Sequence, residues 1–401
     1  MLDVAVLGQV ALGYSPFIDP KRTVSATRLT VFPIRPEVQL DAAQLLDAIT
    51  GVWPATGGRV SLNVASESLL HDLMRAQPSG NVMIEVPAFM ACDPAHSDVI
   101  RALHGRGNTL LIKGRPLQEL PREVLPCFTY SIIDLSDDRR IDESPAGAAR
   151  QSRSMGYAQA GVRTVAEMDA SFARGAALVL GWPIHDLVQP VKTSGRTAVQ
   201  TDLQVIVELM QRLDSQEPID KLELTLKRDP SLAFKLLRYI NSPAFGLRVE
   251  ISSFRHAIMM LGYQRLKRWL ALLLASSSKD VNLKPLMFAA LRRGLLMEEL
   301  VRSSGDEEMR SEMFICGVFS LLDRMFHQPF EQLLGSIPVP ERVYQSLVKG
   351  DGPFQPYVDV VRAAEDGSLY DFREAADRLM MGVAEINRAQ LRALLAASQL
   401  E

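Results

Sequence analysis

The sequence contains little of what marks secreted, membrane-spanning or disulfide-bonded proteins. Its 401 residues include only three cysteines, Cys92, Cys127 and Cys316, which form no Cys-x-x-Cys unit and cannot all pair within one chain. The start, MLDVAVLGQV, lacks the positive charge of a signal peptide and looks more like a first strand. The longest apolar run, Trp269 to Ala275, is too short to cross a bilayer. We therefore predict a soluble cytoplasmic protein with no membrane partner.

Excess charge and long aromatic stretches are also missing. The chain carries 44 basic and 47 acidic residues, a net charge of −3, which gives no long-range attraction toward nucleic acid. Nucleic acid is therefore not an expected partner. Apolar residues make up 47% of the chain, and a globular chain of this length usually forms more than one hydrophobic core. Two domains are expected.

The first 190 residues alternate apolar strand patterns with helical patterns, which is typical of an α/β fold with a parallel sheet. So many successive units favour closure into a barrel over an open sheet. The expected strands are Ala26–Phe32, Arg59–Val64, Asn81–Val86, Thr109–Ile112, Phe128–Leu135 and Ala177–Leu180. The expected helices are Gln39–Ile49, Ser66–Ala76, Ser97–Gly105, Pro116–Val124 and Thr164–Ala173.

After a connector rich in polar residues and glycine, the chain shows helical patterns almost to its end. The segment Asp229–Gly246, DPSLAFKLLRYINSPAFG, begins with an Asp-Pro helix start and stops at Asn-Ser-Pro. A helix from Ser253 is expected to end at Gly262 and another to run from Tyr263 to Ser276. The remaining expected helices are Asp202–Leu213, Ile219–Lys227, Leu286–Ser303, Glu312–Phe326 and further pieces to Ala397.

This helical half resembles the HDOD family, a helical domain related to HD-type phosphohydrolases but without their metal ligands. The resemblance rests on a series of short motifs in the family order. They are the Asp-Pro start at Asp229, Leu236-Leu237, Asn241-Ser242-Pro243, Ile251-Ser252, Ala257-Ile258 and Leu261-Gly262. It implies an all-α HDOD domain in this half of the chain.

The N-terminal half resembles the EAL family of barrel phosphodiesterases, which hydrolyse cyclic di-GMP. The segments that carry the resemblance are Ser61-Leu62-Asn63-Val64, Ile84-Glu85-Val86, Ile132-Ile133-Asp134, Gly161-Val162-Arg163-Thr164 and Gly175 with Gly181-Trp182-Pro183. The two resemblances together imply a degenerate EAL-type (β/α) barrel over residues 1–190, a linker over 191–201 and a helical HDOD domain over 202–401.

The EAL resemblance also locates a site that has lost most of its ligands. Two-metal hydrolysis needs several carboxylates around two cations. On this alignment the signature Glu falls at about Thr27, the paired Asp residues fall near Leu111–Lys113, the Lys becomes Ile132, and the late Glu residues become Ala160 and Arg163. Asn63, Glu85 and Asp134 remain as vestigial nucleotide-site residues, or as ordinary strand-end polar groups. We predict no catalytic residue, no metal and no cofactor.

The histidines do not restore an HD-type centre. His71-Asp72 and His185-Asp186 lie outside the helical half, which contains only His256 and His327. A catalytic metal normally takes three protein ligands, so these residues do not predict one.

A basic run in the helical half has two readings. Arg265, Lys267 and Arg268, together with Arg248 and Arg255, form either an anion-binding face or a solvated helix flank. The solvated flank is favoured because few aromatic side chains are interleaved with the run.

The sequence therefore predicts a bacterial signal-transduction regulator or adaptor that acts through protein contacts, with a silent EAL-like barrel and an HDOD output domain. The partner is a signalling protein that the sequence does not identify, and a homodimer is compatible with the EAL resemblance. Two alternatives stay open: a receptor that binds cyclic di-GMP without hydrolysis, and a residual cyclic di-GMP phosphodiesterase.

Overall fold

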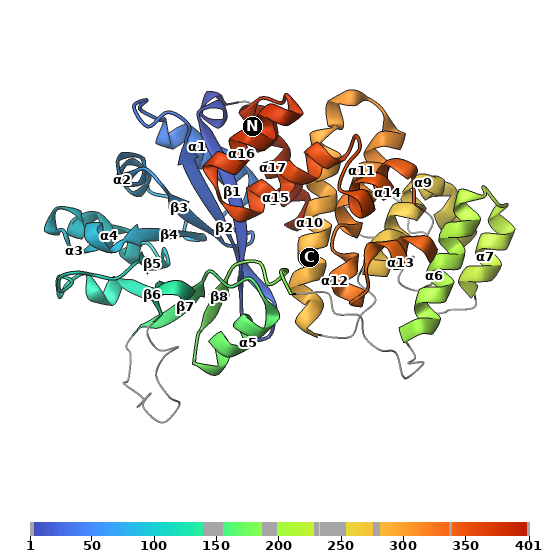
Figure 1. Ribbon diagram of the computed structural model, residues 1–401. Coiled ribbons are helices and arrows are strands. Elements are labelled where there is room, and N and C mark those ends of the chain that lie inside the picture. Colours follow the sequence, from blue (N-terminus) through green and yellow to red (C-terminus); the bar gives the residue numbers. More distant parts are fainter. Residues whose placement is uncertain are drawn as a thin grey trace. The chain divides into compact units, whose positions relative to one another are not determined.

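The computed structural model describes residues 4–138, 155–186, 199–227, 232, 254–275, 281–336 and 339–398. The chain divides into two compact units. The first comprises Met1–Asp186 with Arg362–Leu391, and the second comprises Leu187–Val361 with Arg392–Glu401. Figure 1 labels the helices and strands of both.

The first unit is built on a closed eight-stranded barrel with the strands in sequence order. The strands are β1 (Val10–Ile18), β2 (Val24–Pro33), β3 (Val60–Val64), β4 (Val82–Pro87), β5 (Leu110–Lys113), β6 (Phe128–Asp134), β7 (Gly156–Ala160) and β8 (Leu178–Leu180). This confirms the expected α/β barrel.

The expectation of an entirely parallel sheet was wrong for β1, which runs antiparallel to both β2 and β8. β1 and β2 are joined by a tight turn in which the Asp19 N–H donates to the Thr23 carbonyl at 2.9 Å and the Thr23 N–H donates to the Asp19 carboxylate at 2.9 Å. So short a connection can only join antiparallel strands.

The sequence analysis also missed one strand and predicted one helix that does not form. The missed strand is β7, because its sequence GYAQA lacks the run of branched and aromatic residues that signals a strand. The helix expected at Pro116–Val124 does not form; turns and a 3₁₀ turn at Leu125–Cys127 stand there instead. Pro121 explains this, because it falls inside the expected helix and proline lacks the N–H that a helix needs beyond its first turn.

The barrel interior is a packed apolar core. Its members come from alternate positions of the strands, as the two-residue repeat of a β-strand requires: Phe17, Ala26, Met83, Leu111, Ile132, Ala158, Ala160, Leu178 and Leu180. Around the barrel lie α1 (Ala42–Val52), α2 (Glu67–Arg75), α3 (Ala88–Cys92), α4 (Ser97–Gly105) and α5 (Val165–Ala173). Most of the conserved chemistry of such barrels is placed where parallel strands end.

A C-terminal segment far away in sequence belongs to the first unit. It contains α16 (Leu369–Leu379) and part of α17 (Val383–Ser398). The buried Asn387 side chain donates to the carbonyls of Leu7 at 2.8 Å and Val10 at 2.6 Å, and accepts the Leu12 N–H at 3.2 Å. The sequence-based division, by contrast, assigned all of residues 202–401 to one helical domain.

The second unit is helical. Its helices are α6 (Val199–Asp214), α7 (Ile219–Lys227), α9 (Phe254–Ala275), α10 (Lys284–Leu300), α11 (Glu307–Phe319), α12 (Leu322–Phe326), α13 (Phe330–Ser336), α14 (Glu341–Tyr344) and the first part of α15 (Gln355–Asp366). The helix expected at Ile219–Lys227 has those bounds, whereas the one expected at Glu312–Phe326 is split between α11 and α12. Among the described residues, no helix has the length and apolar character needed to cross a membrane.

Gly262 interrupts α9, as the sequence predicted. Its φ of 69° and ψ of 168° are open to glycine but strained for other residues. The segment Asp229–Gly246 and the linker expected at 191–201 lie almost entirely outside the described residues, so the features expected there stay predictions.

Candidate functional site at the barrel mouth

The polar side chains of the barrel gather where the parallel strands end. Ala26, Met83, Leu111 and Ile132 point into the interior, and side chains two residues further along each strand point the same way. This places Arg28, Glu85, Lys113 and Asp134 on inward positions of β2, β4, β5 and β6. Ser61 and Asn63 on β3 join them through the hydrogen bonds described next.

The centre of the site is a buried ion pair between Arg28 and Glu85. Arg28 Nε donates to Glu85 Oε1 at 2.8 Å, and Arg28 Nη2 donates to Oε2 at 2.6 Å. Ser61 Oγ donates to the same Oε1 at 3.0 Å. The residue Glu85 is 1% exposed, so its charge depends on these donors in place of water.

A second set of contacts links Asn63 to Lys113. Asn63 Nδ2 donates to Thr30 Oγ1 at 3.3 Å, and Lys113 Nζ donates to Asn63 Oδ1 at 2.7 Å. Partial withdrawal of the Lys113 ammonium from water lowers the pKa of Lys113, as does the nearby Arg28 guanidinium, while Glu85 opposes both effects. The two cations are therefore close enough to repel each other.

Asp134, the third residue that the sequence singled out, is engaged locally. Its Oδ1 accepts the Ser136 N–H at 3.0 Å and the Ser136 hydroxyl at 2.7 Å, capping the 3₁₀ turn that follows β6. The structure thus places Asn63 and Glu85 in two neighbouring sets of strand-end contacts, whereas Asp134 behaves as an exposed turn residue.

Sequence reasoning missed Arg28, Ser61 and Lys113. The alignment placed the signature glutamate at about Thr27, but the alternation from Ala26 turns Thr27 away from the interior and directs Arg28 inward. Arg28 therefore reaches Glu85 from the strand on which the resemblance placed the signature glutamate. Counting strand positions in twos from Ala26 would have found it, but nothing in the sequence alone identifies Glu85 as its partner.

The side chains at this site do not fit a divalent metal. Ile132 and Ala160 contribute apolar side chains to the interior cluster, and two cations, Arg28 and Lys113, lie beside the buried carboxylate. The described residues contain no group of three or more His, Cys, Asp or Glu side chains able to hold a metal ion. A divalent ion at Glu85 would have to displace a bidentate guanidinium and approach an ammonium, which electrostatics opposes.

Next to the mouth lies a groove of about 620 Å³. Lys113 and Arg115 line it together with two markedly exposed apolar side chains, Phe89 at 62% and Leu117 at 97%. Aromatic and cationic groups in a concave site are the features that bind nucleotides or peptides.

Three basic residues of the helical unit form ion pairs with neighbouring helices, whereas Arg265 of the same run is exposed. Lys267 pairs with Asp214 of α6, and Arg268 pairs with Glu298 of α10. Arg255 pairs with Asp220 and, at 3.3 Å, with Glu223, both on α7. These side chains hold helices together and do not form the anion-binding face that was one of the two readings of the sequence. Arg248 lies outside the described residues.

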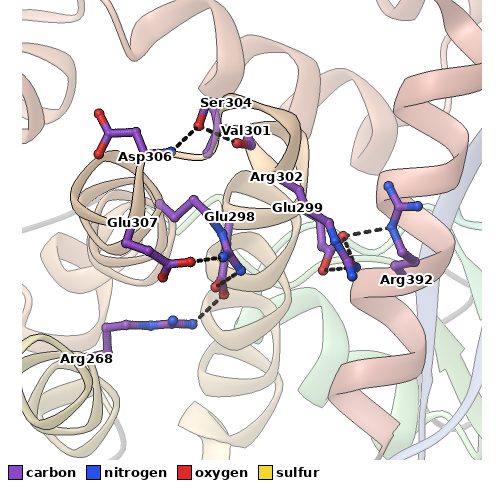
Figure 2. Close-up of polar contacts among 10 residues, drawn as sticks. Arg268, Glu298, Glu299, Val301, Arg302, Ser304, Asp306, Glu307 and Arg392 are labelled. Atoms are coloured by element: carbon purple, nitrogen blue, oxygen red, sulfur yellow. Dashed lines mark hydrogen bonds and ion pairs between the residues drawn. The ribbon is translucent and has the colours of Figure 1, made fainter. Parts of the chain in front are cut away.

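Figure 2 shows how the acidic residues of α10 take part. Glu298, 7% exposed, accepts from Arg268 and, at 3.1 Å, from Arg310. The next residue, Glu299, accepts from Arg392 at 2.7 Å and from Arg302 at 3.3 Å. Both glutamate side chains are paired with arginines. These ion pairs link α10 to neighbouring parts of the chain and engage the carboxylates that a metal would need.

The His-Asp pairs of the sequence and His327 make local contacts. His71 of α2 lies edge-on to His96, with ring centroids 5.7 Å apart, and the Asp186 carboxylate accepts the Val165 N–H at 2.8 Å, at the start of α5. His327 ends α12 in a left-handed conformation with φ of 51°.

Comparison with known proteins finds similarities for both halves of the chain. Residues 200–326 match the HDOD domain. Over 179 residues, 43% of this chain, the sequence is 29% identical to the uncharacterized protein YuxH of Bacillus subtilis. Over 145 residues, 36% of this chain, it is 29% identical to the cyclic di-GMP phosphodiesterase CdgJ of Vibrio cholerae. These alignments cover 43% and 34% of the two relatives, respectively, well under half of either.

The barrel also resembles solved EAL structures. One is a standalone EAL protein from Vibrio cholerae O395 bound to cyclic di-GMP, 16% identical, covering 44% of this chain and 91% of that one with a TM-score of 0.32. Another is the EAL enzyme Bd1971 bound to cAMP and cyclic di-GMP, 13% identical, covering 44% and 61% with a TM-score of 0.34.

Proposed function

We propose that this chain, which combines a barrel of EAL-like form with an HDOD domain, is a non-catalytic regulator or adaptor in bacterial signal transduction and acts through protein contacts. The barrel is a pseudoenzyme in this proposal, and the helical unit carries the output. The relation to cyclic di-GMP signalling rests on the two domain types and on the relative named as a cyclic di-GMP phosphodiesterase.

The observation that carries the proposal is the Arg28–Glu85 ion pair beside Lys113. Hydrolysis of a phosphodiester by two metal ions needs bridging carboxylates free to bind them. Here the buried carboxylate is held by a guanidinium, and an ammonium lies nearby, so the positive charge that a metal would supply comes from side chains that cannot activate water.

Turnover of cyclic di-GMP with Mg²⁺ or Mn²⁺ tests the silent barrel directly. We expect the purified chain to leave the dinucleotide intact, with product measured by chromatography. The informative variant is Asp134→Asn, because the exposed Asp134 can be changed without disturbing the buried pair. Hydrolysis by the parent chain that disappears in Asp134→Asn would overturn the proposal.

Protein contact by the helical unit is tested with surface variants. Leu224 of α7 and Met259 of α9 are 64% and 57% exposed, on helices that pack together. We expect a Leu224→Ser/Met259→Ser chain to lose proteins that co-purify with the parent chain, and Leu117→Ser, on the barrel, to keep them. Loss only with Leu117→Ser would instead assign the output to the barrel.

A second candidate function is a receptor that binds cyclic di-GMP without hydrolysing it. The groove lined by Phe89, Lys113 and Arg115 favours it, because a base can stack on Phe89 while the cations face phosphate. Calorimetry decides between the two: saturable binding that weakens in Arg115→Gln supports the receptor, and its absence leaves the adaptor.

A further inference from the structure

A polar cavity of about 370 Å³ in the helical unit has no role in the function proposed above. It lies among the end of α6, the middle of α9 and the first turns of α11, with Val339 and Pro340 closing one side. Its volume lies within the range of small-ligand sites. The residues that line the cavity all belong to the second unit, so its lining does not depend on the barrel.

Acidic side chains outnumber basic ones around the cavity. Asp214, Glu308 and Glu312 line it, and Lys267 is the basic residue among its lining. Lys267 is paired with Asp214, and Arg342, which does not line the cavity, pairs with Glu312 Oε2 at 2.8 Å. Glu308, exposed on the first turn of α11, has no basic partner among the residues that the structure describes, and its single negative charge suits a monovalent cation.

A second observation concerns a residue of the same lining. Ser311, which lines it, is 3% exposed, and its hydroxyl has no hydrogen-bond partner among the described residues. A buried hydroxyl without a partner costs free energy that a ligand donor would recover. Beside it, burial raises the pKa of Glu312 and the charge of Glu308 adds to the rise, while Arg342 and Lys267 oppose it.

The apolar and aromatic residues of the lining indicate which kind of cation fits. Leu213 and Ile315 supply apolar surface, on which an alkyl chain can pack. The Tyr263 ring is held in place by its hydroxyl, which donates to the Glu217 carbonyl at 2.8 Å. A planar guanidinium stacks on an aromatic ring and donates to several acceptors at once, which an ammonium does less well.

We propose that this cavity binds a guanidinium group, with Glu308 and Glu312 as its carboxylate acceptors and Ser311 as a neutral one. The group belongs either to a small free ligand or to an arginine side chain of a partner protein. Both sources present the same chemistry to Glu308, Ser311 and Tyr263. The inference does not rest on the proposed adaptor role.

Calorimetry on the full chain tests the site with three matched probes. They are Nα-acetyl-arginine amide, its uncharged isostere Nα-acetyl-citrulline amide, and Nα-acetyl-lysine amide. We expect saturable binding of the arginine probe, weaker binding of the lysine probe and none of the citrulline probe. A peptide with one central arginine, run in parallel, separates the sources: tighter binding of the peptide indicates a partner protein, and tighter binding of the amide indicates a free ligand.

Variants tie the binding to this cavity. Glu308→Gln and Ser311→Ala should each weaken the arginine probe, Glu308→Gln by roughly tenfold because charge-assisted hydrogen bonds are the stronger ones. Glu307→Gln is the matched control, since Glu307 lies one residue away and pairs with Arg310. No binding by the parent chain, equal binding of the citrulline probe, or equal weakening by Glu307→Gln and Glu308→Gln would each overturn the proposal.

Discussion

At the scale of single residues, the barrel mouth is built on contacts between polar and charged side chains of different strands. The carboxylate of the buried Glu85 accepts hydrogen bonds from Arg28 and Ser61. A buried ion pair contributes little net stability compared with apolar residues, but removing one partner leaves a charge without compensation. Comparing single and double substitutions of Arg28 and Glu85 therefore separates the net stability of the pair from the cost of leaving one charge buried alone.

Arg28→Leu should destabilise the protein strongly, by about 3 to 5 kcal/mol, because it strands the Glu85 carboxylate. The double variant Arg28→Leu/Glu85→Leu should recover most of that loss, since no charge remains buried. Denaturant unfolding measures both. Arg106→Leu, at an exposed position after α4, is the control and should change stability little. Equal losses in the single and double variants would contradict this account.

Glu312 makes a pH-dependent contribution to stability with a defined sign. Burial raises its pKa above the ordinary 4.5, so the folded state holds a proton that the unfolded state has already released. Stability should therefore fall as the pH rises from about 4.5 through the raised pKa. Glu312→Gln should remove this slope, and Glu307→Gln should keep it. Urea unfolding across that range checks the prediction, and parallel curves for the parent chain and Glu312→Gln would contradict it.

At the scale of elements, the closest helix packing occurs where α10 crosses α11. Gly294 and Gly317 face each other there: a Cβ on Gly317 would lie 2.5 Å from the Arg293 carbonyl oxygen and 2.6 Å from the Gly294 Cα. Backbone atoms cannot move aside as a flexible side chain can. These glycines thus set the distance between the two helices that carry Glu298, Arg310 and the cavity residue Ser311.

Gly317→Ala should destabilise the helical unit by about 1 to 3 kcal/mol, because overpacking shifts the backbone. Thermal unfolding followed by circular dichroism measures this. Gly105→Ala is the matched control, because a Cβ there would meet nothing within 4 Å, and alanine at a helical glycine is neutral to slightly stabilising. A Gly317→Ala protein as stable as the parent would show that α10 and α11 can separate freely.

At the scale of the whole molecule, the chain order does not follow the compact units. Arg362–Leu391 belongs to the barrel unit although about 175 residues of the other unit precede it. A barrel prepared by cutting the chain near residue 190 would lack α16 and the Asn387 side chain. Experiments that separate the roles of the two units are therefore better done with point variants of the full chain.

Asn387→Leu should loosen β1 and the segment before it, because the carbonyls of Leu7 and Val10 and the Leu12 N–H would lose their partner. Each buried polar group left without a partner costs about 1 to 3 kcal/mol. Hydrogen exchange of peptides covering residues 4–18 should rise markedly, while Tyr370→Ser, at a 74% exposed position of α16, should leave it unchanged. Unaltered exchange in Asn387→Leu would rule out this anchoring role.

The sequence determined by itself what depends on local patterns. Alternating strand and helix signals specified the barrel, the bounds of α7 followed from its apolar spacing, and Gly262 marked the break in α9, because each of these is set by residues close together in the chain. The HDOD domain was likewise evident from its ordered motifs. Pro121, inside the segment expected to be helical, was a local signal against a helix that the prediction did not take into account.

Only the tertiary structure decided which side chains meet. Arg28 and Glu85 lie 57 residues apart, and Asn387 reaches residues 375 to 380 positions earlier in the sequence. The identity of such partners depends on the register of strands and the packing of distant segments, which no short stretch encodes. That is why the sequence could single out Asn63 and Glu85 as candidate site residues, whereas the cations Arg28 and Lys113 that contact them became visible only in the fold.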